Sequence, residues 1–519
     1  MLAAIRSAAV LGVQAYDVTV EVDVAHGLPQ WTIVGLAAGA VRESRQRVSA
    51  ALLNAGFALP PRRVTVNLAP ADIRKEGTAF DLPIALAYLA ATGQLDASLI
   101  ENILALGELG LDGSIRAVRG VLPVAARLAR QRAVHDPRLV LVIPAPNAGE
   151  ASLVEGVDLT APASLGELVS ALQRRDLVAP PPSVEREISA AEGDADFADV
   201  VGQDTAKRAL EIAAAGGHNV LLVGPPGAGK TMLARRLPGI LPALTQREAL
   251  EVLAIHSVAG ILPRSVVMPV MRPFRAPHHS VSAAGLIGGG SVPRPGEASL
   301  AHLGVLFLDE LLEFPRMVLD AMRQPLEDGS VTIARAHAAV EFPARFTLIG
   351  AMNPCPCGKA GDASLACTCA AADIQRYRSR LSGPLADRID VHVNVGALPL
   401  RLLSAGERGE SSASIRARVE AARARQRARF GANGGVACNA QAQGRWLDRH
   451  GGATADARAL LAAGAERLAL SARGYHRVLK VARTIADLDG EADIGVSAVA
   501  EALRYRPALP ASADEVVTD

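Results

Sequence analysis

Aromatic residues, cysteine and long apolar runs are all scarce in this sequence of 519 residues. Aromatic residues make up 3% and hydrophobic residues 50%, so we expect cores built from Ala, Val and Leu. Four of the five cysteines crowd between 355 and 369, unlike the disulfide framework of a secreted protein. No apolar stretch approaches the ~20 residues that cross a bilayer. We therefore expect a cytoplasmic protein without a membrane partner.

Excess charge is also lacking, because the formal net charge is only +1. This balance excludes a chain that binds nucleic acid through its overall charge, so any such site must be local or created by symmetry. The first 15 residues are mildly apolar and continue into an alternating stretch, Val18–Val24. That alternation is typical of a strand rather than of a signal-peptide cleavage site.

The composition and the pattern of expected strands and helices along the chain predict a division into four segments. Residues 1–172 alternate short strands with Ala-rich helices, as in an α+β domain, and residues 173–196 are Pro-rich and then acidic, as in a linker. Residues 197–400 alternate strands with helices, as in a doubly wound parallel sheet, and residues 401–519 are helical. Within the first segment we expect strands at Val18–Val24, Arg63–Asn67 and Leu139–Ile143, and helices at Arg42–Ala55 and Leu82–Ala91.

One octapeptide predicts a phosphate-binding loop. It follows an apolar run at 219–223 and precedes a helical pattern, and it reads Gly224, Pro225, Pro226, Gly227, Ala228, Gly229, Lys230, Thr231. Small residues let successive backbone N–H groups face phosphates at a helix N-terminus. Lys230 is expected to reach the β- and γ-phosphates of ATP, and the Thr231 hydroxyl to hold Mg²⁺.

Two further apolar strands end in polar residues suited to hydrolysis. The first, at 303–308, ends in Asp309 and Glu310, and the second, at 346–352, ends in Asn353. Asp309 would hold Mg²⁺ through water, and Glu310 would polarise the attacking water. The alternative is that both acids merely cap the following helix.

With these residues in place, the chain resembles the AAA+ ATPases, and more narrowly the magnesium-chelatase-like family of ComM, also called YifB. The resemblance covers almost the whole length. It rests on the stretches 201–203, 275–280, 294–297, 306–310, 323–327 and 483–488, which read VGQ, RAPHHS, RPGE, LFLDE, RQPLE and RTIADL. Among these, Val201 and Gly202 are implied at the nucleotide site.

The same resemblance implies three sensing or catalytic roles. Asn353 is the implied sensor of the γ-phosphate or the lytic water. Arg388 is the implied arginine finger, delivered into the site of a neighbouring subunit in a ring of six. Arg477 is the implied γ-phosphate sensor of a C-terminal lid. The alternatives are pairing of Arg388 with a neighbouring acid (Asp387 or Asp390) and a solvated helix face for Arg477.

Two insertions carry basic residues. Between Lys230 and Asp309 lie 78 residues, more than one strand–helix unit needs, and the surplus at 268–297 contains a Gly288–Gly290 hinge. A second insertion, 329–342, reads as a hairpin. The basic side chains expected to contact DNA are Arg272, Arg275, Arg294, Arg335 and His337. In the resembled class such insertions point into a central pore, where six copies would make a basic ring; the alternative is an ordinary surface loop.

The cysteine cluster predicts a zinc site. Cys355, Cys357, Cys367 and Cys369 lie on one loop directly after Asn353. Four thiolates complete one tetrahedral Zn²⁺ shell and would staple a loop that has little core of its own. The alternative is four free, reduced thiols.

The first domain resembles the proteolytic domain of Lon-type proteases over residues 63–147. The nucleophilic serine of that family corresponds to Ala79 here, and its general-base lysine to Leu122. A Ser–Lys mechanism needs both groups. We therefore expect an inactive domain that assembles the ring or guides nucleic acid.

The resemblance implies a hexameric DNA helicase that drives branch migration during natural transformation. Its expected partners are single-stranded and branched DNA, further copies of the chain and recombination proteins. ATP, Mg²⁺ and a structural Zn²⁺ are the expected cofactors. The alternatives are a magnesium-chelatase-type metal-insertion chaperone and an ATP-dependent protease, the second disfavoured by Ala79 and Leu122.

Overall fold

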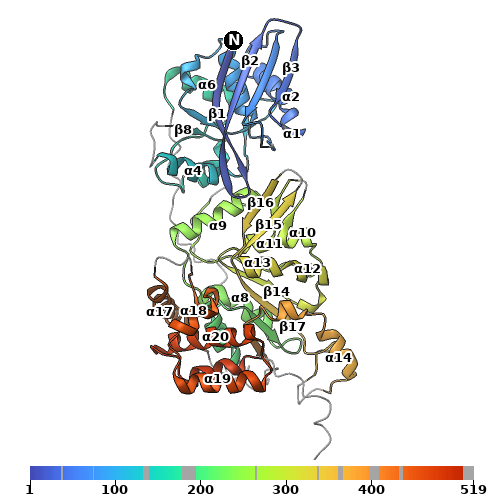
Figure 1. Cartoon of the computed structure of the whole chain (residues 1–519). Coiled ribbons are helices and arrows are strands. Elements are labelled where there is room, and N and C mark those ends of the chain that lie inside the picture. The colour runs from blue at the N-terminus through green and yellow to red at the C-terminus, as the bar shows by residue number, and fades with distance from the viewer. Residues whose placement is uncertain are drawn as a thin grey trace, which may run out of the picture.

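The computed structural model places three parts one after another along the molecule (Figure 1). A blue N-terminal domain lies at one end, a green and yellow core in the middle, and an orange and red helical part packs beside the core. The structure describes residues 1–36, 39–73, 75–132, 139–177, 195–263, 266–290, 292–335, 338–360, 366–397, 408–431 and 436–506. Most of the expected linker, 173–196, therefore lies outside the described residues.

The N-terminal domain is built on a mixed seven-stranded sheet of order β3-β4-β2-β1-β5-β8-β9. Its strands are β1 (Leu2–Leu11), β2 (Gln14–Ala25), β3 (Gln30–Val34), β4 (Arg63–Ala69), β5 (Ile103–Ala105), β8 (Val140–Val142) and β9 (Asp158–Thr160), with a separate β6 (Glu108–Leu109) and β7 (Ile115–Arg116) pair. The three predicted strands are confirmed. β1 was not expected, and it pairs antiparallel with β2 along its full length.

The helices of this domain cover the sheet. They are α1 (Gly39–Arg42), α2 (Ser44–Asn54), α3 (Asp81–Ala91), α4 (Val121–Arg132), α5 (Ala148–Ala151) and α6 (Leu165–Arg174), with short η1 (Ala97–Leu99) and η2 (Ala145–Asn147) turns. The predicted helix at 82–91 is confirmed as α3, all of whose residues are buried. The predicted helix at 42–55 is interrupted at Glu43, so it forms α1 and α2.

The core contains a wholly parallel sheet of order β11-β14-β17-β10-β18. Its strands are β11 (Phe274–Arg275), β14 (Val305–Leu308), β17 (Thr347–Met352), β10 (Val220–Val223) and β18 (Val391–Asn394). Val220 and Leu222 join one apolar cluster and Leu221 another, so both faces of the sheet are covered. Because all strands run the same way, the loops that follow β10, β14 and β17 meet at one edge.

Helices and short turns connect the strands of the core. They are η3 (Phe197–Asp199), α7 (Asp204–Gly216), α8 (Lys230–Ile240), α9 (Gln246–Ala259), α10 (Ala283–Ile287), α11 (Glu297–Leu300), η4 (Leu311–Glu313), α12 (Arg316–Ala321), α13 (Arg323–Asp328), α14 (Ala371–Arg378) and α15 (Gly383–Ala386). The predicted doubly wound class is confirmed. The expectation that 268–297 is all insertion is wrong, since Phe274–Arg275 forms the edge strand of the core sheet beside β14.

Both predicted insertions nevertheless contain hairpins, and the hairpins lie side by side. The second forms β15 (Ser330–Arg335) and β16 (Ala338–Pro343), as expected, and the first contributes β12 (Gly288–Gly289) and β13 (Arg294–Pro295). A Cβ on Gly288 would lie 3.1 Å from the Ile333 side chain, so the two hairpins touch. Val13, at the β1–β2 turn, packs on the apolar cluster of the longer hairpin.

The C-terminal part is helical, as predicted, across the residues described. It comprises α17 (Ser412–Phe430), η5 (Asn439–Gln441), α18 (Gly444–His450), α19 (Ala455–Arg467), α20 (Ala472–Asp489) and α21 (Val496–Arg504). These helices share one apolar cluster with α7, α8 and β10. Among the described residues, no helix is long and apolar enough to cross a membrane.

The N-terminal domain rests on helix α9 of the core. α4 packs its apolar side against Leu253 of α9 in a shared cluster. The Ser257 hydroxyl donates to the Glu150 carboxylate at 2.6 Å across this contact, and burial raises the pKa of Glu150.

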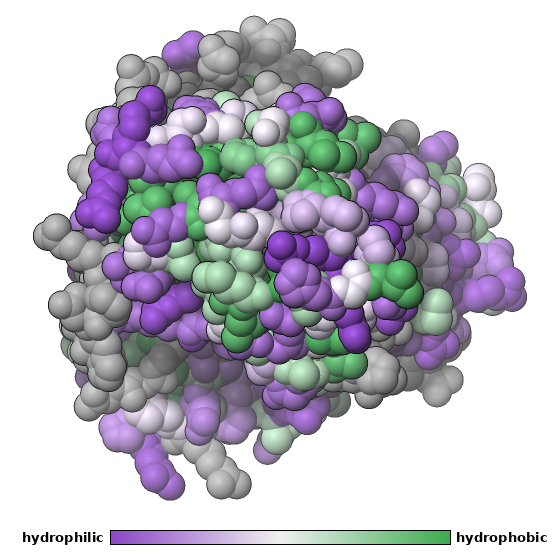
Figure 2. Space-filling view, turned by 90° about the horizontal axis from the view of Figure 1, so that it is seen from above, coloured by the Kyte–Doolittle hydropathy of each residue, from purple (hydrophilic) through white to green (hydrophobic). Residues whose placement is uncertain are grey.

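Seen from above, the exposed end of the N-terminal domain mixes apolar patches with polar side chains and is not uniformly hydrophilic (Figure 2).

Candidate functional site

The phosphate-binding loop joins β10 to α8 in the middle of the core sheet. Gly227 and Gly229 have φ of 79° and 88°, left-handed values that favour glycine. Gly224 is required for a different reason, because a Cβ there would lie 2.1 Å from the Val395 carbonyl oxygen. Glycines at these positions allow the tight turn before α8 that a phosphate-binding loop needs.

Lys230 connects the loop to the neighbouring strand. Its Nζ donates to the carbonyl oxygens of Gly224 (2.7 Å) and Pro225 (2.9 Å), and to Asn353 Oδ1 at 3.2 Å. Burial lowers the pKa of Lys230, while Asp309 and Glu310 act in the opposite direction. The predicted sensor Asn353 therefore lies beside the predicted phosphate lysine.

The pair expected to hold Mg²⁺ is also in contact. Thr231 Oγ1 donates to Asp309 Oδ2 at 2.7 Å, although 78 residues separate the two in sequence. A hydroxyl and a carboxylate oxygen are ligands that suit Mg²⁺, directly or through water. The two residues therefore fit the ion.

Glu310 stands slightly apart from this cluster. Its backbone is left-handed, with φ of 50°, and its side chain is 60% exposed. His279 Nδ1 lies 3.6 Å from a Glu310 carboxylate oxygen, and the His278 ring lies 4.0 Å from that of His279. From the sequence, these histidines belong to the expected insertion at 268–297. They lie next to Glu310 because β11, which precedes them, pairs with β14, which precedes Glu310.

Val201 and Gly202 lie just before Gln203, the residue that caps the start of α7. The next residue, Gln203, donates from Nε2 to the Gly396 carbonyl oxygen at 2.7 Å and toward the Ala228 carbonyl oxygen at 3.4 Å. This contact ties the 201–203 stretch to the phosphate loop and to the end of β18.

Arg388 and Arg477 lie at the opposite edge of the sheet from the phosphate loop of their own chain. Arg477 donates to Asp390 at 2.6 Å, and Asp390 directly precedes β18, at the amino ends of the strands. Arg388 donates to the Pro384 carbonyl oxygen at 2.6 Å and pairs with Glu327, not with either neighbouring acid. The structure therefore brings the two arginines to one edge but not to Lys230.

A cleft of about 700 Å³ at this edge collects basic side chains. It is lined in part by Arg388, Arg423, Arg427, Arg473, Arg477 and Lys480. Burial by itself raises the pKa of the Asp390 carboxyl. His218 and Arg477 more than offset this effect, and they hold that pKa well below its usual range. The lid and the core thus meet around a buried ion pair.

The arginines expected to contact DNA have different surroundings. Arg272 is largely buried and donates to the carbonyl oxygens of Pro242 (2.7 Å) and Leu303 (2.9 Å), and Arg275 makes a two-pronged pair with Glu297 at 2.6 and 2.8 Å. These contacts give Arg272 and Arg275 structural roles within the chain. Arg294 is exposed on β13.

The tip of the longer hairpin is only partly described. Arg335 ends β15, but its side chain and the whole of His337 lie outside the described residues.

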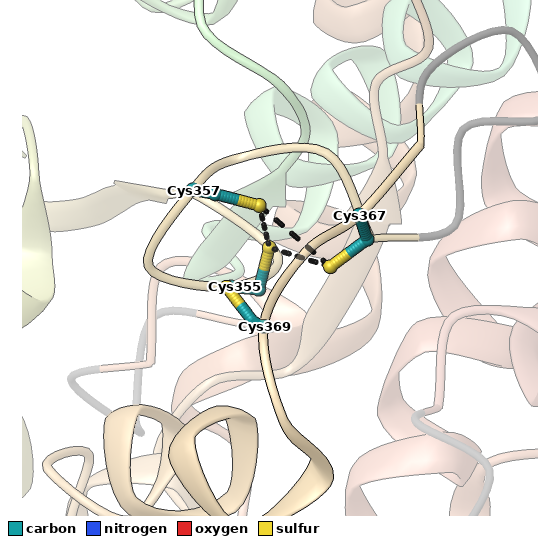
Figure 3. Close-up of side chains that lie close together, drawn as sticks. All are labelled: Cys355, Cys357, Cys367 and Cys369. Atoms are coloured by element: carbon teal, nitrogen blue, oxygen red, sulfur yellow. Dashed lines mark hydrogen bonds between the residues drawn. The ribbon is translucent and has the colours of Figure 1, made fainter.

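The four cysteines converge after Asn353 (Figure 3). All four sulfur atoms lie within 4.8 Å of one another, and three Sγ–Sγ distances are 3.4 Å (Cys355–Cys357), 3.7 Å (Cys355–Cys367) and 3.6 Å (Cys357–Cys367). A tetrahedron with Zn–S bonds of about 2.3 Å has edges of about 3.8 Å, whereas a disulfide would bring two sulfurs to about 2.05 Å. The arrangement fits one tetrahedral metal ion.

Backbone N–H groups support negative charge on these sulfurs. The Ala360 N–H donates to Cys355 Sγ at 3.3 Å. The N–H groups of Lys359 and Thr368, followed by the Cys355 thiol, lower the pKa of Cys357 to about 6. Such donors are the usual outer support of thiolate ligands.

In the N-terminal domain, the two positions that correspond to the catalytic serine and lysine of Lon-type proteases belong to one apolar cluster. Leu122 is buried in it and Ala79 packs against it. Neither side chain can act as a nucleophile or a base.

Comparison with known proteins matches family models for the magnesium chelatase subunit ChlI at residues 20–145 and 196–402, and for the C-terminal part of that subunit at 409–506. The competence protein ComM of Haemophilus influenzae is 45% identical over 511 residues, 97% of each chain. The uncharacterized protein YifB of Escherichia coli is 42% identical over 517 residues, again 97% of each chain. Lon protease 2 of Bacillus subtilis is 31% identical over 183 residues, 31% of this chain and 33% of that protein.

The full-length relatives align through the N-terminal domain, the ATPase core and the helical part alike, so the expected resemblance is confirmed. The chain belongs to the ComM and YifB family of magnesium-chelatase-like AAA+ proteins, with an N-terminal domain similar to part of Lon protease.

Proposed function

We propose that this protein is an ATP-driven motor that acts on DNA as a hexameric ring and drives branch migration during recombination of incoming DNA. One observation carries the proposal. The phosphate loop, Asp309, Glu310 and Asn353 meet at one edge of the core sheet, while Arg388 and Arg477 lie at the other edge. A second copy of the chain would supply the arginines that the first lacks at its own ATP site.

The chemistry follows from the side chains at the first edge. Lys230 exchanges the carbonyl oxygens that it now contacts for the β- and γ-phosphates of ATP. Thr231 and Asp309 would hold Mg²⁺, which would offset the phosphate charge. Glu310 accepts a proton from the attacking water, and Asn353 orients the γ-phosphate.

The second edge supplies the missing positive charge. The transition state spreads negative charge over the transferred phosphoryl group, and an arginine finger accelerates such reactions by roughly 10³–10⁵. Arg388 and Arg477 would enter the neighbour's site by exchanging Glu327 and Asp390 for phosphate oxygens. ATP binding would therefore strengthen the contact between subunits.

The adjoining hairpins are the proposed grip on DNA. They lie together beside the N-terminal domain. Arg294 is exposed on the shorter hairpin, and Arg335 is the last residue of strand β15 in the longer one. Six copies would concentrate positive charge that one chain of net charge +1 does not have. We propose single-stranded and branched DNA as the partners; the related ComM of Haemophilus influenzae is named a competence protein.

The test compares Arg335→Ala and Arg294→Ala with Arg467→Ala, which removes an exposed arginine of α19 in the helical part. We expect the hairpin variants to bind and unwind forked DNA more weakly, to show a shallower log–log dependence of affinity on salt, and to keep basal ATPase activity. The Arg467 variant should match the parent. DNA that neither binds nor stimulates the parent ATPase would instead favour a metal-insertion chaperone related to magnesium chelatase.

Proteolysis is a weaker alternative, because the cluster that contains Leu122 and Ala79 offers no Ser–Lys pair. Cleavage of unfolded casein by the parent protein would revive it.

We also propose that the four cysteines bind one Zn²⁺. Their sulfur spacing fits a tetrahedral shell, and each thiolate would supply one bond. Metal analysis of protein purified without added zinc should give about one zinc per chain. Four freely titratable thiols and no zinc would exclude the site.

A further inference from the structure

We propose that the cysteine loop is a metal-dependent brace of the ATP site, which couples zinc occupancy to nucleotide binding and hydrolysis. The inference rests on the proposed zinc and ATPase functions and adds a regulatory link between them. It comes from two links between the cluster and the nucleotide site, one through the chain to Asn353 and one through a contact with the phosphate loop.

The first link is covalent. β17 ends at Met352, and Asn353 then accepts a hydrogen bond from Lys230. Only Pro354 separates Asn353 from Cys355, which is fully buried. A metal ion that fixes Cys355 therefore also restricts where the Asn353 amide can lie.

The second link is a direct contact with the phosphate loop. Gly358 has φ of +80°, and a Cβ on it would lie 2.5 Å from Cδ of Pro226. The Gly358 N–H donates to the Cys355 carbonyl oxygen at 2.9 Å, which closes a tight turn. The turn therefore reaches from the sensor Asn353 to the loop that holds the phosphates.

The described part of the loop has little else to hold it in place. Cys355 is buried, but Cys357 and Cys369 are only half-buried and Cys367 is exposed. On the far side, Arg378 of α14 donates to the Pro354 carbonyl oxygen at 3.1 Å. Four metal–sulfur bonds would therefore supply most of the loop's order, as in small zinc modules without a core.

Two variants distinguish the effect of the metal from the effect of the contact between Gly358 and Pro226. Cys367→Ser with Cys369→Ser removes two ligands at the end of the loop away from Asn353. Gly358→Ala keeps all four thiols but pushes against Pro226. The matched control is Lys359→Ala, an exposed position of the same loop that leaves both features in place.

Each protein is assayed for bound zinc, for equilibrium binding of a fluorescent ATP analogue and for steady-state ATP turnover. We expect the double variant to lose zinc, and both it and Gly358→Ala to lose about tenfold or more in turnover or nucleotide affinity, the scale of damage to the support of a site. Gly358→Ala should retain its zinc, and Lys359→Ala should match the parent in every assay.

Chelation provides the second route if the double variant fails to fold. Zinc is removed from the folded parent and added back, while circular dichroism monitors the fold. Nucleotide affinity that falls and then recovers supports the brace. A zinc-free, folded protein with parental affinity and turnover would overturn it, even though the zinc site and the ATPase would both stand.

Failure of the underlying functions gives different results. A parent without zinc refutes the metal and the brace together. A parent that contains zinc but hydrolyses no ATP refutes the motor, and nucleotide affinity then decides on the brace alone.

Discussion

Lys230 and Glu310 have opposite environments at the same site. The Lys230 ammonium is buried among carbonyl oxygens and the Asn353 amide, whereas the Glu310 carboxylate is 60% exposed and faces His279. These environments suit the proposed roles, in which Lys230 binds phosphate oxygens and Glu310 orients the attacking water. The nearby His279 offers Glu310 a partner that competes with this role.

At the residue scale, Glu310→Gln should bind ATP but hydrolyse it at least about 100-fold more slowly, because the amide cannot accept the proton of the attacking water. Steady-state phosphate release and binding of a fluorescent ATP analogue test this. Glu313→Gln, three residues later and paired with Arg380, is the control and should turn over normally. Near-normal hydrolysis by the Glu310 variant would contradict its assignment.

At the element scale, β18 places a titratable group inside the junction of core and lid. The His392 backbone N–H donates to the Tyr505 carbonyl oxygen at 2.9 Å, just beyond α21. Burial, and then the charge of Arg506, lower the pKa of His392 from 6.5 to about 4. The ring therefore stays neutral in the folded protein at pH values where it would be charged after unfolding.

This shift predicts a loss of stability in acid. The unfolded chain binds a proton at His392 as the pH falls below about 6.5, but the folded chain binds it only near pH 4. His392 should therefore reduce the free energy of unfolding by about 2 kcal/mol between pH 7.5 and pH 5. Denaturant unfolding of His392→Gln and of the parent at both pH values measures the difference; an equal pH dependence would contradict the shift.

At the scale of the whole molecule, the proposed ATP site and the two arginines Arg388 and Arg477 lie at opposite ends of the strands of one sheet. The phosphate loop follows the carboxyl end of β10, while Asp390 and its partner Arg477 lie at the amino ends of the strands. A head-to-tail arrangement of copies brings unlike edges together and closes into a ring when the rotation allows. Each interface would then contain one complete ATP site.

The ring predicts complementation between two inactive proteins. Arg388→Ala should abolish hydrolysis yet bind nucleotide, and Lys230→Ala should lack its own phosphate site. Mixing them should restore part of the activity, because some interfaces would combine an intact Lys230 with an intact Arg388. Mass photometry should verify that mixed rings form; mixed rings without activity would contradict placement of Arg388 in the neighbour's site.

The amino-acid sequence by itself determined the elements whose signal is local. The alternating stretch Val18–Val24 gave β2, the apolar run before Gly224 gave β10, and the stretch 329–342 gave a hairpin. The spacing of the cysteines likewise predicted their convergence, since all four lie within 15 residues. β1 escaped prediction because its Ala-rich sequence has weak strand propensity, and it is specified by pairing with β2.

Only the tertiary structure decided which distant side chains meet. Glu310 lies beside His279, and Gly358 lies against Pro226. Arg388 pairs with Glu327, and Arg275 forms part of the edge strand β11 of the core sheet. These contacts depend on strand order and on the packing of helices over the sheet, which no local pattern encodes. Periodicity fixes the face that a residue presents, whereas the fold chooses the partner that faces it.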